Sequence, residues 1–198
     1  MTAQIPDLFL YRGVEYSLSG ISEATLFEPS MFGLEPVANC SACWRGYQAV
    51  FALVGSQLVL GTFHVTLCEP EGHFVRQEGP PINGMLPTGP TEARDLFNNH
   101  YVDLNYSLDY TGGLLLARGF LRELYVHMGF HPAWKYEQAV ELIFDKGVLE
   151  DVYNRSKRIA RIRERILKAA ERGDGKDRRT LEEIWDFVER SFDRKYRW

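Results

Sequence analysis

The sequence of 198 residues has few cysteines and no long hydrophobic run. No apolar stretch approaches the roughly 18 residues that a membrane-spanning helix needs, and the apolar residues 8–11 are too few for the core of a signal peptide. Three cysteines, an odd number, favour reduced thiols over a disulfide framework. We therefore expect a cytoplasmic protein that does not enter a membrane.

Two common catalytic motifs are also missing. The sequence has no G-x-x-x-x-G-K-[ST] phosphate loop, and no serine stands in the G-x-S-x-G setting of a nucleophile elbow. Nucleotide hydrolysis is therefore disfavoured. The hydrophobic fraction of 45%, with 13% aromatic residues, is that of an ordinary globular protein. A chain of this length buries about 70% of its unfolded surface on folding, so a sizeable core needs no disulfides.

The net charge of −4 hides a division along the chain. Residues 1–152 contain 8 Lys and Arg against 18 Asp and Glu, which gives −10. Residues 153–198 contain 15 against 9, which gives +6. An acidic body thus carries a basic tail, and such asymmetry bears on binding partners rather than on fold.

Turn signals between apolar runs predict a series of β-hairpins. Arg12-Gly13 interrupts residues 7–19, Gly55-Ser56 interrupts residues 42–67, and Lys146-Gly147 separates two further runs. Gly55 suits the positive φ of a type II′ turn. Both apolar runs around it alternate without a polar face, which is typical of buried strands.

Other segments are assigned from their periodicity. Residues 101–108 alternate polar and apolar, which predicts a half-buried strand, and Arg118-Gly119 is interpreted as a turn between two more strands. The segment 20–38 should be a loop whose residues Leu26, Phe27, Met31 and Phe32 pack onto the sheet. The Gly- and Pro-rich run 69–95 should lie on the surface.

The tail predicts two helices. An apolar stripe at helical spacing runs from Val152 through Ile159, Ile162 and Ile166 to Ala169. Gly173 is the predicted end of this helix. A capping box at Thr180 and a second apolar stripe up to Phe192 follow it. We expect an α+β protein with two parts: an acidic body (1–152) of about eight to ten antiparallel strands in a sandwich or strongly bent sheet, and a basic helical hairpin (153–198).

One candidate site is a zinc centre. Cys40 and Cys43 have the C-x-x-C spacing of a zinc knuckle, and His64 and Cys68 lie four residues apart, on one side of a strand. The alternative is that the cysteines are small apolar packing residues, which the single C-x-x-C favours. The working expectation is therefore no cofactor, with zinc as the alternative.

A second candidate is a cluster of polar and aromatic residues near two strands. Arg45, Tyr47, Glu15 and His127, together with His131, would supply a cation, a phenol, a carboxylate and imidazoles for acid–base chemistry. The alternative is structural: Arg45 stacks on an aromatic ring or pairs with a buried carboxylate.

A third candidate is the first tail helix, which carries seven cations against Glu164 and Glu171. Such a helix could contact nucleic-acid phosphates, an acidic protein or the acidic body itself. No aromatic residue follows Tyr153 in it on which bases could stack. The predicted contact residues in the tail are Arg155, Arg158, Arg161, Arg165, Lys168, Trp185 and Trp198.

The stretches SACWRGYQAV, DYTGGLLL and YVHMGFHPAWKYEQAVELIFDKGVL give the chain a resemblance to a loose group of uncharacterised bacterial β-rich proteins. The shared features are W-R-G-Y before a hairpin and Y-V-H-M-G before a closing hairpin, and they span residues 8–149. The resemblance implies a small cytosolic bacterial protein and supplies no activity. Accessory and immunity proteins of bacterial conflict systems are often of this kind.

These observations favour a non-enzymatic protein that binds a protein partner, as a bacterial accessory or immunity-type factor. The first alternative is nucleic-acid binding through the helix at 155–168. The second is a small-molecule enzyme that uses His127 and Arg45, which requires a pocket where the two side chains meet.

Overall fold

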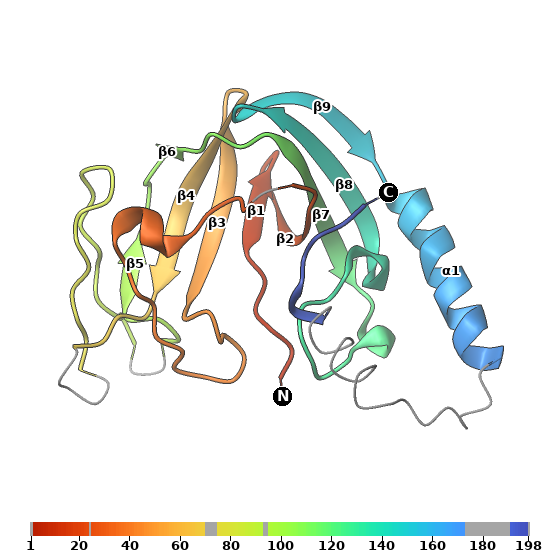
Figure 1. Ribbon diagram of the computed structural model, residues 1–198, viewed down its shortest axis with the longest axis horizontal. Helices are drawn as coiled ribbons and strands as arrows, with labels where there is room; N and C mark the ends of the chain where they lie inside the picture. The colour runs from red at the N-terminus through yellow and green to blue at the C-terminus, as the bar shows by residue number, and fades with distance from the viewer. Residues whose placement is uncertain (1, 24, 70–74, 93–94, 173–190, 198) are drawn as a thin grey trace.

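A computed structural model describes residues 2–23, 25–69, 75–92, 95–172 and 191–197 (Figure 1). The described residues form an α+β fold with one strongly bent, mixed sheet of nine strands and a long helix after the last strand. The strands are β1 (Leu8–Tyr11), β2 (Val14–Ile21), β3 (Tyr47–Val54), β4 (Gln57–Val65), β5 (Asn99–Tyr101), β6 (Tyr106–Ser107), β7 (Gly112–Phe120), β8 (Tyr136–Asp145) and β9 (Val148–Asn154). The helix α1 is Ser156–Arg172, and the 3₁₀ turns are η1 (Pro29–Phe32), η2 (Arg122–Leu124) and η3 (Ala133–Lys135).

The strand pairings close on themselves. The order is β3-β1-β2-β7-β8-β9-β4, and β4 also pairs with β3 along its whole length. The contact between β9 and β4 is short, with Gln57 opposite Val148 and two backbone hydrogen bonds, from Leu149 N–H to the Ser56 carbonyl at 2.8 Å and from Leu58 N–H to the Gly147 carbonyl at 2.7 Å. Among the nine described strands, only the pair β1 and β3 is parallel. The bent sheet therefore encloses its own core, and β5 and β6 lie along β4.

The three hairpins predicted from turn signals are confirmed. Arg12 and Gly13 join β1 to β2 with φ of 52° and 73°, and Lys146 and Gly147 join β8 to β9 with φ of 47° and 80°. Gly55 joins β3 to β4 with φ of 62°. Positive φ at consecutive residues matches the right-handed twist of the paired strands, which is why these short turns fix the register.

Two strand predictions are wrong. Residues 101–108 do not form one strand, because Asp103 and Asn105 take positive φ of 54° and 45° and separate β5 from β6. Arg118-Gly119 is not a turn. Strand β7 continues through it to Phe120 because β8 supplies a partner along almost the whole length, and the chain then enters η2 rather than another strand.

The main core lies inside the bend of the sheet. Phe9, Phe51, Phe63 and Tyr101 are fully enclosed there, and Phe27 from the 20–38 loop meets Phe63 edge-on at 5.1 Å between ring centroids. The predicted packing of that loop is confirmed for Leu26, Phe27 and Phe32, but Met31 is exposed.

A smaller apolar cluster lies on the outer face of β7 and β8. Leu115, Ala117 and Ala139 from the sheet pack there against Ile159 of α1, which is completely buried. Helix α1 starts at Ser156 and not at Val152, since β9 continues to Asn154. The predicted boundary at 152/153 thus falls inside β9. The second predicted helix, from Thr180, falls mainly on residues 173–190, outside the described part of the chain.

The segment 191–197 returns to the sheet beside β2. Ile21 N–H donates to the Arg194 carbonyl at 2.9 Å, and Tyr196 N–H donates to the Ile21 carbonyl at 3.2 Å. Phe192 stacks on Trp44 with 5.0 Å between ring centroids. Segment 191–197, blue in Figure 1, therefore lies against β2, a strand near the N-terminus.

Candidate functional site

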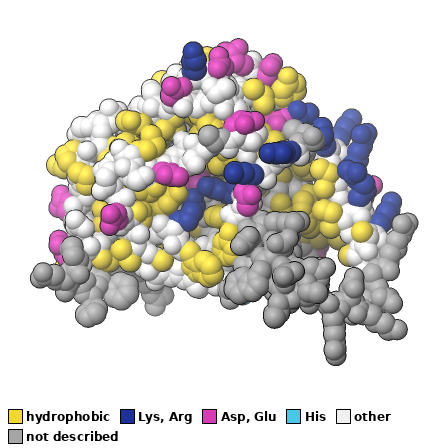
Figure 2. All heavy atoms as spheres, viewed as in Figure 1, with side chains coloured by type: hydrophobic (Ala, Val, Ile, Leu, Met, Phe, Trp, Pro, Cys, Tyr) yellow, Lys and Arg dark blue, Asp and Glu magenta, His cyan; other side chains and the backbone are white. Residues whose placement is uncertain are grey.

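Helix α1 has two chemically opposite faces. Ile159, Ile162 and Ile166 fall on the side of the sheet, because residues three and four apart share one face of a helix. The other side is exposed and carries five cations, Lys157, Arg158, Arg161, Arg165 and Lys168. They belong to the dark-blue band along α1 in Figure 2.

The cations of α1 are used in two ways. Arg155 pairs with Glu141, and Arg163 donates to the Tyr136 carbonyl at 3.1 Å, so both are directed at the body. Within the described ranges, Lys157, Arg161, Arg165 and Lys168 make no hydrogen bond or ion pair. Of the remaining predicted contact residues, Trp185 and Trp198 lie outside the described residues.

A groove of about 810 Å³ separates the inner face of α1 from the segment 123–135. Segment 191–197 forms its third side. The groove walls are mainly apolar, with Ile162, Ile166 and Leu167 on the helix. Its polar residues include Lys135 and His131. The volume is in the range of roughly 300–1,000 Å³ that is typical of small-molecule sites.

The predicted acid–base cluster is not assembled as expected. Arg45 and Tyr47 do meet, with the guanidinium 4.6 Å from the Tyr47 ring centroid. His127 is exposed and bonds to the Tyr125 hydroxyl at 2.9 Å, and Glu15 is exposed on the β1–β2 hairpin. Neither Arg45 nor His127 lines the groove. The distant strands that carry these residues hold them at separate places.

The structural alternative for Arg45 is confirmed, because it stacks on aromatic rings and pairs with a buried carboxylate, Asp7, which sequence reasoning did not single out. Asp7, whose side chain is 4% exposed, accepts from Arg45 at 2.8 and 3.1 Å, from Arg194 at 2.6 Å and from Ala49 N–H at 2.9 Å. Phe130 lies about 5 Å from both guanidinium groups. The cluster joins the N-terminus, β3 and segment 191–197.

The Asp7 cluster predicts a loss of stability in acid. Burial alone would raise the pKa of Asp7, but Arg45, Arg194 and the hydrogen bonds outweigh it and lower the pKa from 3.8 to about 2. At about 1.36 kcal/mol per pKa unit, this difference stabilises the fold by about 2.5 kcal/mol above pH 4. That contribution should disappear as the pH falls from about 4 to about 2.

Urea denaturation of the wild type and an Asp7→Asn variant at several pH values tests this. Other carboxylates titrate in the same range, so the informative quantity is the difference in unfolding free energy between the two proteins. It should shrink over that pH interval. A difference that stays constant would contradict the assignment.

A second buried carboxylate lies under α1. Glu141, whose side chain is 4% exposed, pairs with Arg155 at 2.5 Å and accepts the Tyr196 hydroxyl at 2.7 Å. Burial and this carboxylate both raise the pKa of Tyr196, so the phenol stays protonated and donates. Both buried carboxylates thus bind a residue of segment 191–197 as well as residues from earlier in the chain.

The four predicted zinc ligands do not form a single cluster. Cys43 is buried, where its thiol contacts the Tyr47 carbonyl at 3.3 Å, and burial raises its pKa. Cys68 bridges to Arg76 through the backbone, whereas His64 pairs with His100. In the described part of the chain, no group of three or more His, Cys, Asp or Glu is arranged to hold a metal ion.

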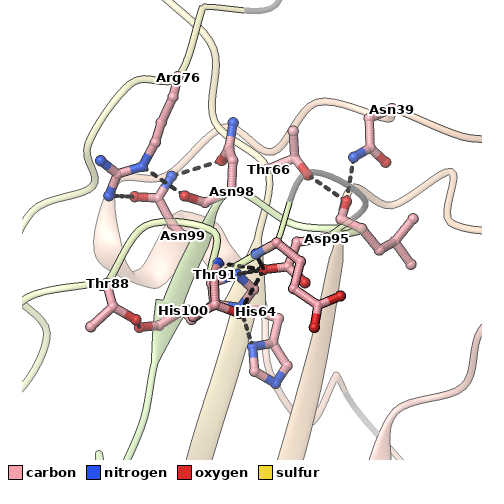
Figure 3. Close-up of polar contacts among 12 residues, drawn as sticks. Asn39, His64, Thr66, Arg76, Thr88, Thr91, Asp95, Asn98, Asn99 and His100 are labelled. Carbon is pink, nitrogen blue, oxygen red and sulfur yellow. Dashed lines mark hydrogen bonds and ion pairs between the residues drawn. The ribbon is translucent and has the colours of Figure 1, made fainter.

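His64 belongs instead to a polar chain at the β4–β5 edge (Figure 3). Its Nδ1 lies 2.9 Å from Nδ1 of His100, whose Nε2 is 3.8 Å from Asp95. Burial and the neighbouring His100 lower the pKa of His64. Backbone N–H groups of Glu92 and Thr91 hold Asp95 and lower its pKa. These polar contacts link β4 and β5 to the loop that joins the two strands.

The Gly- and Pro-rich run is anchored by the same edge. Arg76 donates to the Asn98 carbonyl at 2.7 Å (Figure 3), and the fully buried Asn99 donates to the Gln77 carbonyl at 2.9 Å. Ile82 inserts into the main core. The run is mostly exposed, as predicted, but it is fastened at several points.

In the described ranges no helix is long and apolar enough to cross a membrane. Comparisons with protein-family models, curated proteins and solved structures find no match for this chain.

Proposed function

We propose that the protein binds an acidic protein partner through the exposed face of α1, as a non-enzymatic bacterial accessory or immunity-type factor. The observation that carries this proposal is a set of four cations, Lys157, Arg161, Arg165 and Lys168, that have no hydrogen-bond or ion-pair partner among the described residues. They project from a helix whose other face is fixed to the sheet through Ile159. A rigid row of charges of one sign steers and orients a complementary surface.

A protein partner fits this surface better than a nucleic acid. Exposed Glu150 and Asp151 lie on β9, a few residues before the helix, so the surface carries both signs of charge. An acidic protein can place a cation of its own opposite them, whereas a phosphate backbone offers negative charge alone. The exposed cationic face also has no aromatic side chain on which bases could stack. Nucleic-acid binding through the same cations is the second candidate, favoured by their number.

Charge reversal on α1 tests the proposal. The variant Arg161→Glu, Arg165→Glu and Lys168→Glu should weaken binding of the partner by about a hundredfold, since each lost contact is worth about 1 kcal/mol. The partner is first captured from the host with the wild type, identified, purified and then titrated by calorimetry. Lys146→Glu, at the exposed β8–β9 turn, is the matched control and should bind as the wild type does.

Two outcomes would overturn the protein-partner proposal. One is an unchanged affinity of the triple variant, provided that its thermal melting shows an intact fold. The other is a partner that is released by nuclease treatment and whose binding falls steeply with salt, because the nucleic-acid alternative predicts that behaviour.

A further inference from the structure

We propose that the groove between α1 and residues 123–135 binds an amphipathic monocarboxylate, a molecule with an alkyl chain and one terminal carboxylate. The carboxylate would meet Lys135 and His131, and the chain would lie along the inner face of α1. This site is on the opposite side of α1 from the proposed partner surface and does not depend on it.

The apolar part of the groove offers hydrocarbon surface that the fold leaves uncovered. Ile166 and Leu167 are 37% and 40% exposed although both belong to the inner half of the helix, and Val126 opposite is also exposed. The helix face from Ile159 to Ala170 is about 16 Å long at 1.5 Å per residue. An elongated apolar ligand would remove this surface from water, which is favourable in proportion to the area buried.

The polar end of the groove holds Lys135, a cation that has no counter-ion among the described residues. Lys135 is only 7% exposed, and within the described part of the chain its ammonium makes no hydrogen bond or ion pair. Its Nζ lies 5.4 Å from the centroid of the Trp134 ring. Burial of an ammonium without a carboxylate is costly, and here burial lowers the pKa of Lys135.

His131 adds an unused hydrogen-bonding group beside Lys135. Both ring nitrogens are enclosed, and neither has a partner among the described residues. The ring is stacked on Phe120 at 4.7 Å and meets Tyr125 at 5.3 Å, which fixes its plane. Burial and the charge of Lys135 lower its pKa to about 4, so the imidazole is neutral at pH 7 and can donate one N–H.

A single carboxylate satisfies both groups. It accepts from the ammonium of Lys135 and compensates its charge, and a small shift of His131 brings its enclosed N–H within reach of the carboxylate. The lining also carries charges of both signs, Glu123 and Asp193 as well as Arg194, Lys195 and Arg197, and Arg194 is already paired with Asp7. Because Lys135 carries a single charge, a monoanion is enough to compensate it.

Calorimetric titration with dodecanoate, and with dodecanol as the uncharged counterpart, tests this site. Lys135→Met should raise the dissociation constant for dodecanoate about tenfold or more and leave that for dodecanol unchanged. Lys135→Arg should keep most of the affinity, and Lys146→Met, at an exposed turn, should match the wild type. Binding of dodecanoate should also raise the pKa of Lys135, followed by NMR of the isotopically labelled side chain.

The site is disproved if dodecanoate does not bind the wild type, if Lys135→Met binds it equally well, or if dodecyl phosphate binds more tightly. The NMR titration makes the test independent of whether Lys135→Met folds well. Charge reversal at Arg161, Arg165 and Lys168 should leave dodecanoate binding unchanged, so failure of this site and failure of the partner surface are distinguishable.

Discussion

Replacing Asp7 by Asn should destabilise the protein by about 3–5 kcal/mol, the cost of removing one partner from a buried charge cluster. Each carboxylate oxygen of Asp7 accepts from two donors: one from Arg45 and Ala49 N–H, the other from Arg45 and Arg194. The amide NH₂ of Asn must replace one of these oxygens. In either orientation it faces donors only, so two guanidinium groups lose their counter-ion and some hydrogen bonds are lost.

Urea denaturation at pH 7 measures this effect, with Asp151→Asn as the control. Asp151 is exposed on β9, so its substitution should change the unfolding free energy by less than about 0.5 kcal/mol. Equal midpoints for the two variants would show that the Asp7 cluster does not stabilise the fold.

Replacing Glu141 by Ala should also cost about 3–5 kcal/mol. The change removes the acceptor of both Arg155 and Tyr196 at a position that is almost inaccessible to water, and it leaves space beneath α1. Glu150→Ala, on the exposed side of β9, is the matched control and should be nearly neutral.

A double-mutant cycle separates the lost pairing from the lost volume. Adding Arg155→Ala to Glu141→Ala removes the second member of the ion pair, so this substitution should cost less in the variant than in the wild type, by about 1–3 kcal/mol. Strict additivity of the two substitutions would contradict an energetic coupling between Glu141 and Arg155.

The parts of the fold that could be predicted are those with local signals. The turns at Arg12-Gly13 and Lys146-Gly147 need residues with positive φ, and the glycine at the second position of each indicates such a turn. The apolar stripe of α1 repeats every three to four residues, so the helix and its cationic face were both readable from the spacing. These features depend on residues within one or two turns of each other.

Predictions failed where tertiary pairing decided the outcome. Alternation alone predicted a strand over residues 101–108, but the left-handed residues Asp103 and Asn105 break it. The Arg118-Gly119 dipeptide predicts a turn, as Arg12-Gly13 does. In β7 the neighbouring β8 pairs with almost the whole strand and keeps it extended. Local propensity cannot show which long partner a segment finds.

The candidate sites show the same division. Asp7 had no distinguishing neighbours in sequence, because its partners Arg45 and Arg194 lie 38 and 187 residues away. His100 was likewise missed beside His64, although the two pair across adjacent strands. Sequence reasoning places His131 only in the candidate acid–base cluster and gives no signal for Lys135, and their position in one groove follows only from the fold.

The position of segment 191–197 in sequence also shapes how the protein is made. Translation produces Asp7 early, whereas Arg194 and Tyr196 emerge after the whole sheet and α1. A nascent chain that has already formed its hairpins therefore still lacks Arg194 at Asp7 and Tyr196 at Glu141. These two contacts between the earliest strands, the sheet and segment 191–197 are added only after the rest of the fold has been synthesised.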